Sequence, residues 1–167
     1  NHGSGNIGAT NVNRLIGKKF GSITLILDFF KTFCPCMIMH KYFGTEVGVI
    51  SGYFTILGHM FPIWLKFKGG KGVASYMGYI LATSWPLFIV LIITWLVIVK
   101  IFKYSAIAAI VSILINLITF KIILFTQFNY NILLWIKGDP IEFQFILFIS
   151  IIILIKHYTN LINIFKK

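Results

Sequence analysis

The chain has 167 residues, of which 58% are hydrophobic and only 11% are charged. Soluble domains carry about 25% charged residues, so this composition excludes a soluble globular domain and predicts one polytopic membrane domain over residues 1–167. The net charge of +11 would suggest a nucleic-acid ligand in a soluble protein. Here the cations lie between apolar spans, where the positive-inside rule accounts for most of them, so we expect no nucleic-acid partner.

The chain opens on a glycine-rich polar loop, Gly3-Ser4-Gly5-Asn6-Ile7-Gly8-Ala9-Thr10-Asn11. It leads to Arg14, the only arginine. Glycines bring backbone N–H groups close to a ligand, and a guanidinium binds phosphate through two parallel N–H groups. We therefore predict a phosphate-contacting loop that uses Ser4, backbone donors and Arg14, with a flexible polar linker as the alternative.

The same loop also matches the dinucleotide fingerprint G-x-G-x-x-G, and Asp28 follows at about the expected distance. We exclude a dinucleotide site because no βαβ unit follows and Asp28 lies within an apolar span.

The first apolar span covers roughly 21–40. Asp28 and Lys31 share a helix face in this span, and an ion pair between them would avoid two isolated charges in lipid. We expect this pair to support the first loop from beneath. Cys34 and Cys36 are close on one span and too few to complete a metal site, so we expect core residues and no metal.

The second span covers roughly 46–65 and carries His59 near its end. An ionisable side chain inside a span is a candidate functional residue. Two roles are open for His59: a part in the chemistry, or a hydrogen bond that holds a neighbouring loop in place.

A second glycine-rich loop follows, in which Lys71 lies between Gly70 and Gly72. Membrane topology alone accounts for a short basic loop, but it does not require Gly69, Gly70 and Gly72. Since Gly72 stands where a P-loop has Ser or Thr, we exclude a P-loop and predict a phosphate-binding loop centred on Lys71.

The lysines decide whether residues 73–100 form one long helix or two short helices, at 73–84 and 87–100, separated at Trp85-Pro86. With a turn at Pro86, eleven cations fall on one face and three on the other, and the positive-inside rule assigns the first face to the cytoplasm. The eleven are Arg14, Lys18, Lys19, Lys66, Lys68, Lys71, Lys100, Lys103, Lys156, Lys166 and Lys167, and the three are Lys41, Lys121 and Lys137.

The last two spans cover roughly 105–125 and 143–156. Ser105 opens the first of them, either as a phosphate donor or as a helix N-cap. His157 and Asn160 follow the second and share a helix face. We therefore expect an all-α polytopic membrane helix bundle, with six spans in this chain and seven in an intact chain that has one more helix in front.

Three motifs together resemble the bacterial PlsY family, the integral-membrane acyltransferases that use acyl-phosphate and glycerol 3-phosphate. They are the first loop with Arg14, the segment 58–75, and Lys156-His157 with Asn160. The chain departs from the family at Ala106, where a serine is common, and in its last residues, where the family usually has an arginine and an acid.

The resemblance implies seven helices, the first absent here, and three cytoplasmic motifs around one active site. It makes Ser4, Arg14, Lys71 and His157 the candidate catalytic residues, with Asp28, Lys31 and His59 in support. The candidate substrate-binding residues are Gly3, Gly5, Asn6, Thr10, Asn11, Gly69, Gly70, Gly72, Ser105 and Asn160.

The implied reaction moves a fatty acyl group from acyl-phosphate to the 1-hydroxyl of glycerol 3-phosphate. It yields lysophosphatidate and phosphate, in the first step of phospholipid synthesis. We expect no cofactor and a multi-pass protein of the bacterial inner membrane with a cytoplasmic active site. Its partners would be the two substrates, membrane lipid and an upstream enzyme that forms acyl-phosphate. His157, His59 or the acceptor's own phosphate would take the hydroxyl proton.

The alternative is a small membrane anion or phosphate transporter that uses the same basic loops as a gate. Asp28, Lys31 and His59 are too few intramembrane ionisable residues to line a convincing pore, and polar loops on one face favour an enzyme.

Overall fold

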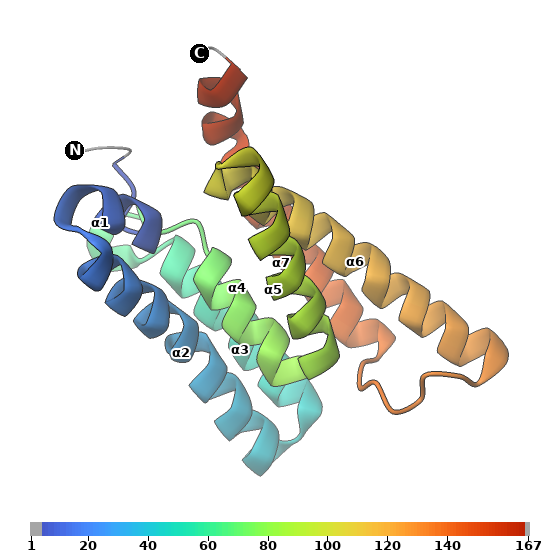
Figure 1. Ribbon diagram of the computed structural model, residues 1–167. Helices are drawn as coiled ribbons and strands as arrows, with labels where there is room; N and C mark the ends of the chain where they lie inside the picture. The colour runs from blue at the N-terminus through green and yellow to red at the C-terminus, as the bar shows by residue number, and fades with distance from the viewer. Residues whose placement is uncertain (1–4, 166–167) are drawn as a thin grey trace. The chain divides into compact units, whose positions relative to one another are not determined.

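The computed structural model describes residues 5–165, and every regular element in that range is helical (Figure 1). The elements are α1 Ala9–Ile16, α2 Lys18–Phe43, α3 Thr45–Met60, the 3-10 turn η1 Ile63–Leu65, α4 Val73–Thr83, α5 Trp85–Phe102, α6 Ser105–Tyr130 and α7 Pro140–Phe165. The all-α prediction is therefore confirmed for the described residues.

Five segments within 5–165 are long and apolar enough to cross a membrane. They are Lys18–Phe43, Thr45–Leu65, Trp85–Phe102, Ser105–Tyr130 and Pro140–Ile162. The predicted sixth span is not confirmed, because α4 has only 11 residues. At about 1.5 Å per residue such a helix reaches about 17 Å, roughly half of a hydrocarbon core of about 30 Å.

The predicted break between residues 73 and 100 is present, one residue before the expected place. Ser84 has extended backbone angles (φ −150°, ψ 106°) and separates α4 from α5. Pro86 then lies in the first turn of α5, where a missing N–H leaves no helical hydrogen bond unmade. Residues 73–100 are consequently not one continuous helix.

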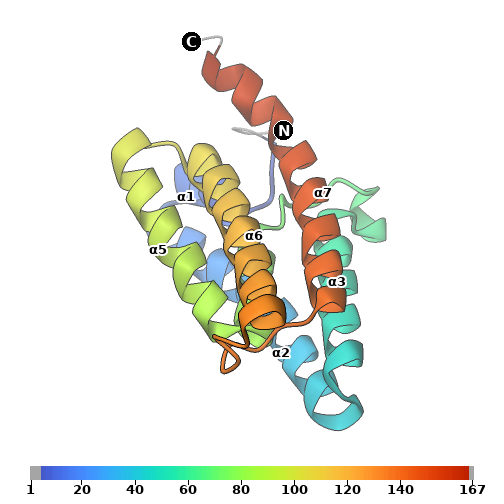
Figure 2. The same ribbon diagram turned by 90° about the vertical axis from the view of Figure 1, so that its right-hand side faces the viewer.

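The chain divides into two compact units, Asn1–Tyr79 and Ile80–Lys167. In the first unit α2 and α3 lie side by side, as Figures 1 and 2 both show. Gly44 joins them with φ +92°, a conformation in which a residue with a side chain would be strained.

Two glycines of α3, one turn apart, allow the helices of the first unit to approach closely. A Cβ at Gly48 would lie 2.8 Å from Cβ of His40, and a Cβ at Gly52 would lie 2.5 Å from the Tyr79 ring. Small residues four positions apart are the usual way in which membrane helices pack, since lipid supplies little hydrophobic drive between them. In α2, Cys36 is buried but Cys34 is exposed, so the prediction of two core cysteines is correct only for Cys36.

The second unit packs α5 on α6 and α6 on α7. Small side chains at Ala106, Ala108 and Ala109 are buried at the start of α6. Further along α6, fully buried Asn116 donates from Nδ2 to the carbonyl oxygen of Leu87 in α5 over 2.7 Å. Such an interhelical bond satisfies an amide that lipid could not.

The start of α7 is fixed by a reciprocal capping arrangement. The Glu142 N–H donates to Oδ1 of Asp139 over 2.8 Å, and the Asp139 N–H donates to Oε2 of Glu142 over 3.3 Å. Pro140 between them takes the first helical position. This capping box satisfies N–H groups that a helix leaves free at its N-terminus, so the acids serve the fold.

Candidate active site

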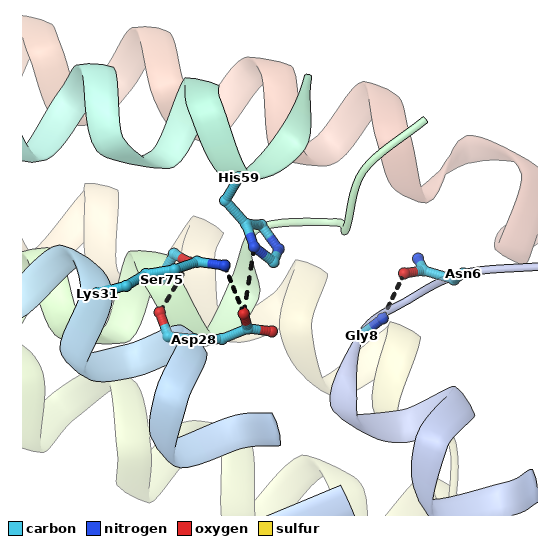
Figure 3. A network of polar contacts seen from close by, with 6 residues as sticks. All are labelled: Asn6, Gly8, Asp28, Lys31, His59 and Ser75. Atoms are coloured by element: carbon cyan, nitrogen blue, oxygen red, sulfur yellow. Dashed lines mark hydrogen bonds and ion pairs between the residues drawn. The ribbon is translucent and has the colours of Figure 1, made fainter. Parts of the chain in front are cut away.

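Asp28 is the centre of a polar network inside the first unit (Figure 3). Its Oδ1 accepts a hydrogen bond from Nζ of Lys31 over 2.6 Å, which confirms the predicted ion pair. The same oxygen lies 3.3 Å from Nδ1 of His59 on α3, which is an ion-pair distance. Its backbone carbonyl accepts from Oγ of Ser75 over 2.9 Å. Asp28 thus joins α2 to α3 and to the start of α4.

The second glycine loop packs directly on the end of α3. The Gly70 N–H donates to the carbonyl oxygen of His59 over 3.2 Å. A Cβ at Gly69 would collide with that same carbonyl oxygen, and one at Gly70 would collide with Nε2 of His59. Gly72 has φ +82°, and a Cβ there would lie 2.9 Å from Sδ of Met60. All three glycines are therefore required by close backbone packing.

This packing favours the second of the two roles left open for His59. Its carbonyl oxygen holds Gly70, while its ring lies between Asp28 and Gly70. Only 8% of the residue is exposed. His59 is thus placed to fix the shape of the loop that presents Lys71, which is itself half-buried.

The first glycine loop is held in shape by its own asparagines. Oδ1 of Asn6 accepts from the Gly8 N–H over 2.8 Å, and Nδ2 of Asn11 donates to the Asn6 carbonyl oxygen over 2.8 Å. Asn11 is only 6% exposed. Gly8 is the N-cap of α1 and provides no side-chain cap, so the N–H groups of Ala9 and Thr10 have no acceptor within the helix. A helix start of this kind suits an anion.

Arg14 lies in the last turn of α1 and is exposed, as is Thr10. No ion pair of Arg14 occurs among residues 5–165. The helix α1, which carries Arg14, packs tightly on α2. The close approach is visible at Gly21, where a Cβ would lie 2.6 Å from Cβ of Asn13. The Arg14 guanidinium is therefore carried on a firmly seated helix.

The third motif belongs to the second unit. His157 is 3% exposed, and its Nδ1 lies 2.8 Å from the carbonyl oxygen of Ile153, one turn earlier in α7. Asn160 follows one turn later and is half-buried. Ser105 is the first residue of α6, whose N-cap is Tyr104, so the N-cap interpretation of Ser105 is wrong.

The predicted site residues fall into three groups in the structure. Gly69, Gly70, Lys71 and Gly72 are assembled with Asp28, Lys31 and His59, while Gly5, Asn6, Thr10, Asn11 and Arg14 form the first loop and α1. Gly3 and Ser4 lie outside the described residues. His157, Asn160 and Ser105 are in the other unit, which is described by itself.

Asp28 and Lys31 support the second loop as well as each other. Among the described residues their contacts run to each other, to His59 and to Ser75; support of the first loop by the pair stays a prediction. Ser75 was not among the predicted site residues. Its signal was its place just after the second loop, at the start of a helix, where a serine usually bonds the backbone.

A sequence profile described as glycerol-3-phosphate acyltransferase matches residues 1–167. Curated relatives with that name include a protein of Bartonella henselae, 37% identical over 95% of this chain and 71% of the relative. Another, from Ehrlichia canis, is 38% identical over 98% of this chain and 78% of the relative.

Solved structures give the same result. A crystal structure of PlsY, an integral membrane glycerol 3-phosphate acyltransferase in its glycerol 3-phosphate form, is similar with a TM-score of 0.85 and 32% identity. The match covers 98% of this chain and 76% of that one. The lysophosphatidic acid form of PlsY is similar with a TM-score of 0.84.

Proposed function

The chain belongs to the glycerol-3-phosphate acyltransferase family and is a membrane acyltransferase, and from this premise we propose its donor, product and site. It transfers a fatty acyl group from acyl-phosphate to the 1-hydroxyl of glycerol 3-phosphate. The products are lysophosphatidate and inorganic phosphate. The observation that carries the site assignment is the second glycine loop, built on Asp28 and His59, with Lys71 between two of its glycines.

The two loops of the first unit match the charge of the proposed substrates. Both substrates carry a phosphate, and the unit offers a start of α1 without a side-chain cap, the Arg14 guanidinium and the Lys71 ammonium. Cations held in a site with little water stabilise charge that develops on the leaving phosphate. We assign Lys71 and Arg14 to this role, with Ser4 as a further donor.

The reaction needs little acid assistance because phosphate is a good leaving group. The acceptor's 1-oxygen bonds to the acyl carbon, the bond from that carbon to the phosphate oxygen breaks, and its electron pair leaves with phosphate. The acceptor hydroxyl loses one proton in this step. A group that accepts this proton completes the balance.

We assign the role of proton acceptor to His157 in preference to His59. A carbonyl oxygen only accepts hydrogen bonds, so Nδ1 of His157 donates to Ile153 and the neutral ring has its lone pair on Nε2. The ring of His59 instead lies between Asp28 and Gly70. The acceptor's own phosphate is the second candidate for the proton.

The acyl tail of the donor can lie in the lipid, against the apolar faces of the long helices. We place both glycine loops on the cytoplasmic face of a bacterial inner membrane, where an upstream enzyme would supply acyl-phosphate. Asn160, Ser105 and the remaining loop residues would complete the binding of the two phosphates.

The test is release of phosphate from acyl-phosphate by the purified protein in lipid vesicles. We expect release to require glycerol 3-phosphate and to equal the lysophosphatidate formed. Phosphate that crosses the vesicle membrane without any acyl transfer would instead support the transporter. Acyl transfer from another donor, with acyl-phosphate inert, would contradict the proposed donor.

A further inference from the structure

Residues 61–68, which we call the apolar turn, connect the end of α3 to the second glycine loop. α3 ends at Met60, and the chain then turns through η1. The turn is closed by its own backbone bonds: the Leu65 and Phe67 N–H groups both donate to the Pro62 carbonyl oxygen, over 3.1 and 3.0 Å. A closed turn of this kind leaves few backbone groups that need water, so it can lie in a partly dehydrated layer.

Three large apolar side chains of the apolar turn are strongly exposed. Trp64 is 80% exposed, Ile63 75% and Phe67 60%. Figure 2 shows the green segment that contains them projecting from the end of α3. A contiguous group of exposed large apolar side chains marks a surface that contacts lipid or another protein.

The length of α3 indicates which of these surfaces it is. Its 16 residues rise about 24 Å, less than a hydrocarbon core of about 30 Å. The apolar segment that can cross the membrane continues into the turn as Thr45–Leu65, so the turn begins within the last few ångströms of the core and reaches the headgroup layer at Lys66 and Lys68. Trp is enriched in this interfacial layer because it has an apolar body and a polar N–H.

The charges of the turn fit the same layer. Lys66 and Lys68 are exposed beside Trp64 and Phe67, and no acid occurs between Glu46 and Asp139 in the sequence. Cations at this depth are attracted to the phosphates of anionic lipids. A protein partner would not account for the match between the length of α3 and the position of the apolar group.

We propose that the apolar turn is an interfacial anchor: it inserts Ile63, Trp64 and Phe67 into the headgroup layer of an anionic bilayer, with Lys66 and Lys68 on lipid phosphates. Because Gly69 follows directly, the anchor would hold the second glycine loop at the membrane surface. This inference does not depend on the proposed reaction.

The test uses Trp64 as its own depth probe. In the variant Trp85→Phe, Trp95→Phe, Trp135→Phe, Trp64 is the only source of tryptophan emission. A matched variant keeps Trp95 as its only tryptophan, which reports the middle of α5. Both are placed in phosphatidylglycerol vesicles that contain lipids brominated either near the headgroup or deep in the chain. We expect Trp64 to be quenched most by shallow bromine and Trp95 most by deep bromine.

Two outcomes would overturn the anchor. In the first, Trp64 is quenched by aqueous iodide but by neither brominated lipid, which would place it in water. In the second, Trp64 is quenched most by deep bromine, as Trp95 is, which would place it inside a span. The change Lys66→Gln, Lys68→Gln should shift Trp64 emission to the red in phosphatidylglycerol vesicles and leave it unchanged in phosphatidylcholine. An equal shift in both lipids would contradict the role of lipid phosphate.

If the triple tryptophan variant does not fold, a nitroxide at Trp64→Cys, with Cys34 and Cys36 changed to Ser, gives the same depth. The expected result is access to both oxygen and a water-soluble nickel reagent, which is typical of the interface. Access to nickel alone would contradict the anchor.

Discussion

At the scale of single residues, Asp28 accounts for the shape of the second loop. Its carboxylate faces both Lys31 and His59, and His59 holds Gly70. The change Asp28→Asn keeps the size of the side chain and removes the charge. Because a hydrogen bond to a charged group contributes about 1.5–3 kcal/mol, and 1.4 kcal/mol is tenfold, we expect kcat/KM for acyl transfer to fall about tenfold or more.

Steady-state kinetics in vesicles measure this fall. Asp28→Glu should recover part of the loss, because it restores the charge. A kcat/KM in Asp28→Asn equal to that of the parent protein would show that Asp28 does not position the loop.

Gly70 makes the most direct test of the contact between loop and His59. We expect Gly70→Ala to lower kcat/KM for acyl transfer by about tenfold or more, since its methyl group would occupy the place of the His59 ring and displace the loop. Gly58→Ala is the matched control, because nothing lies within 4 Å of its Cβ. Equal activity of the two variants would contradict the account.

The sequence was sufficient to predict the Asp28–Lys31 pair, because residues three apart on a helix face each other whatever the fold. It could not predict the contact between Asp28 and His59, since these residues lie on different helices. For the same reason the three glycines of the second loop were interpreted as ligand contacts, although each also lies against the end of α3.

At the scale of elements, the glycines of α3 set how closely it packs in the first unit. Gly52→Ala places a methyl group 2.5 Å from the Tyr79 ring, which is fully buried. We expect this change to destabilise the folded state by about 1–3 kcal/mol, as overpacking does. Thermal unfolding in detergent should show a lower Tm for Gly52→Ala and no decrease in Tm for Gly58→Ala.

Gly58→Ala removes a glycine from a helix without a collision, so its Tm should be equal or slightly raised. A Tm for Gly52→Ala that matches the parent protein would mean that Tyr79 moves freely, and that the close approach is not needed.

Hydropathy located every long helix and also the short one, since α4, Val73–Thr83, lies within one residue of the predicted 73–84. What is not confirmed is the interpretation of this segment as a span, because 11 residues reach only about 17 Å. Proline did reveal the break, although the helix is interrupted at Ser84, just before the first turn that Pro86 can occupy.

At the scale of the whole molecule, the distribution of lysines predicts which loops share a side of the membrane. Single cysteines at Lys68, Lys103 and Lys137, in a chain with Cys34 and Cys36 changed to Ser, can be labelled by an impermeant maleimide in intact cells. We expect Lys137→Cys to react at once and the other two only after permeabilisation. Reaction of Lys103→Cys in intact cells would show that the chain does not reverse at Ser84.

The overall class of the molecule was predictable because composition and lysine placement are properties of the chain as a whole. The number of spans was not, since the segment 73–84 was located but its apolar composition alone led to its being counted as a span. How the motifs of the two units meet depends on contacts between distant segments, which no local pattern encodes.

The central claim is that Lys71, held between glycines on the end of α3, binds substrate phosphate. The most direct test compares Lys71→Ala with Lys121→Ala, an exposed lysine of α6 outside both loops and the apolar turn, in acyl transfer from acyl-phosphate to glycerol 3-phosphate. The account predicts a loss of about 10²–10³-fold for Lys71→Ala and near-parental activity for Lys121→Ala. Near-parental activity of Lys71→Ala, in protein that is folded and inserted, would contradict it.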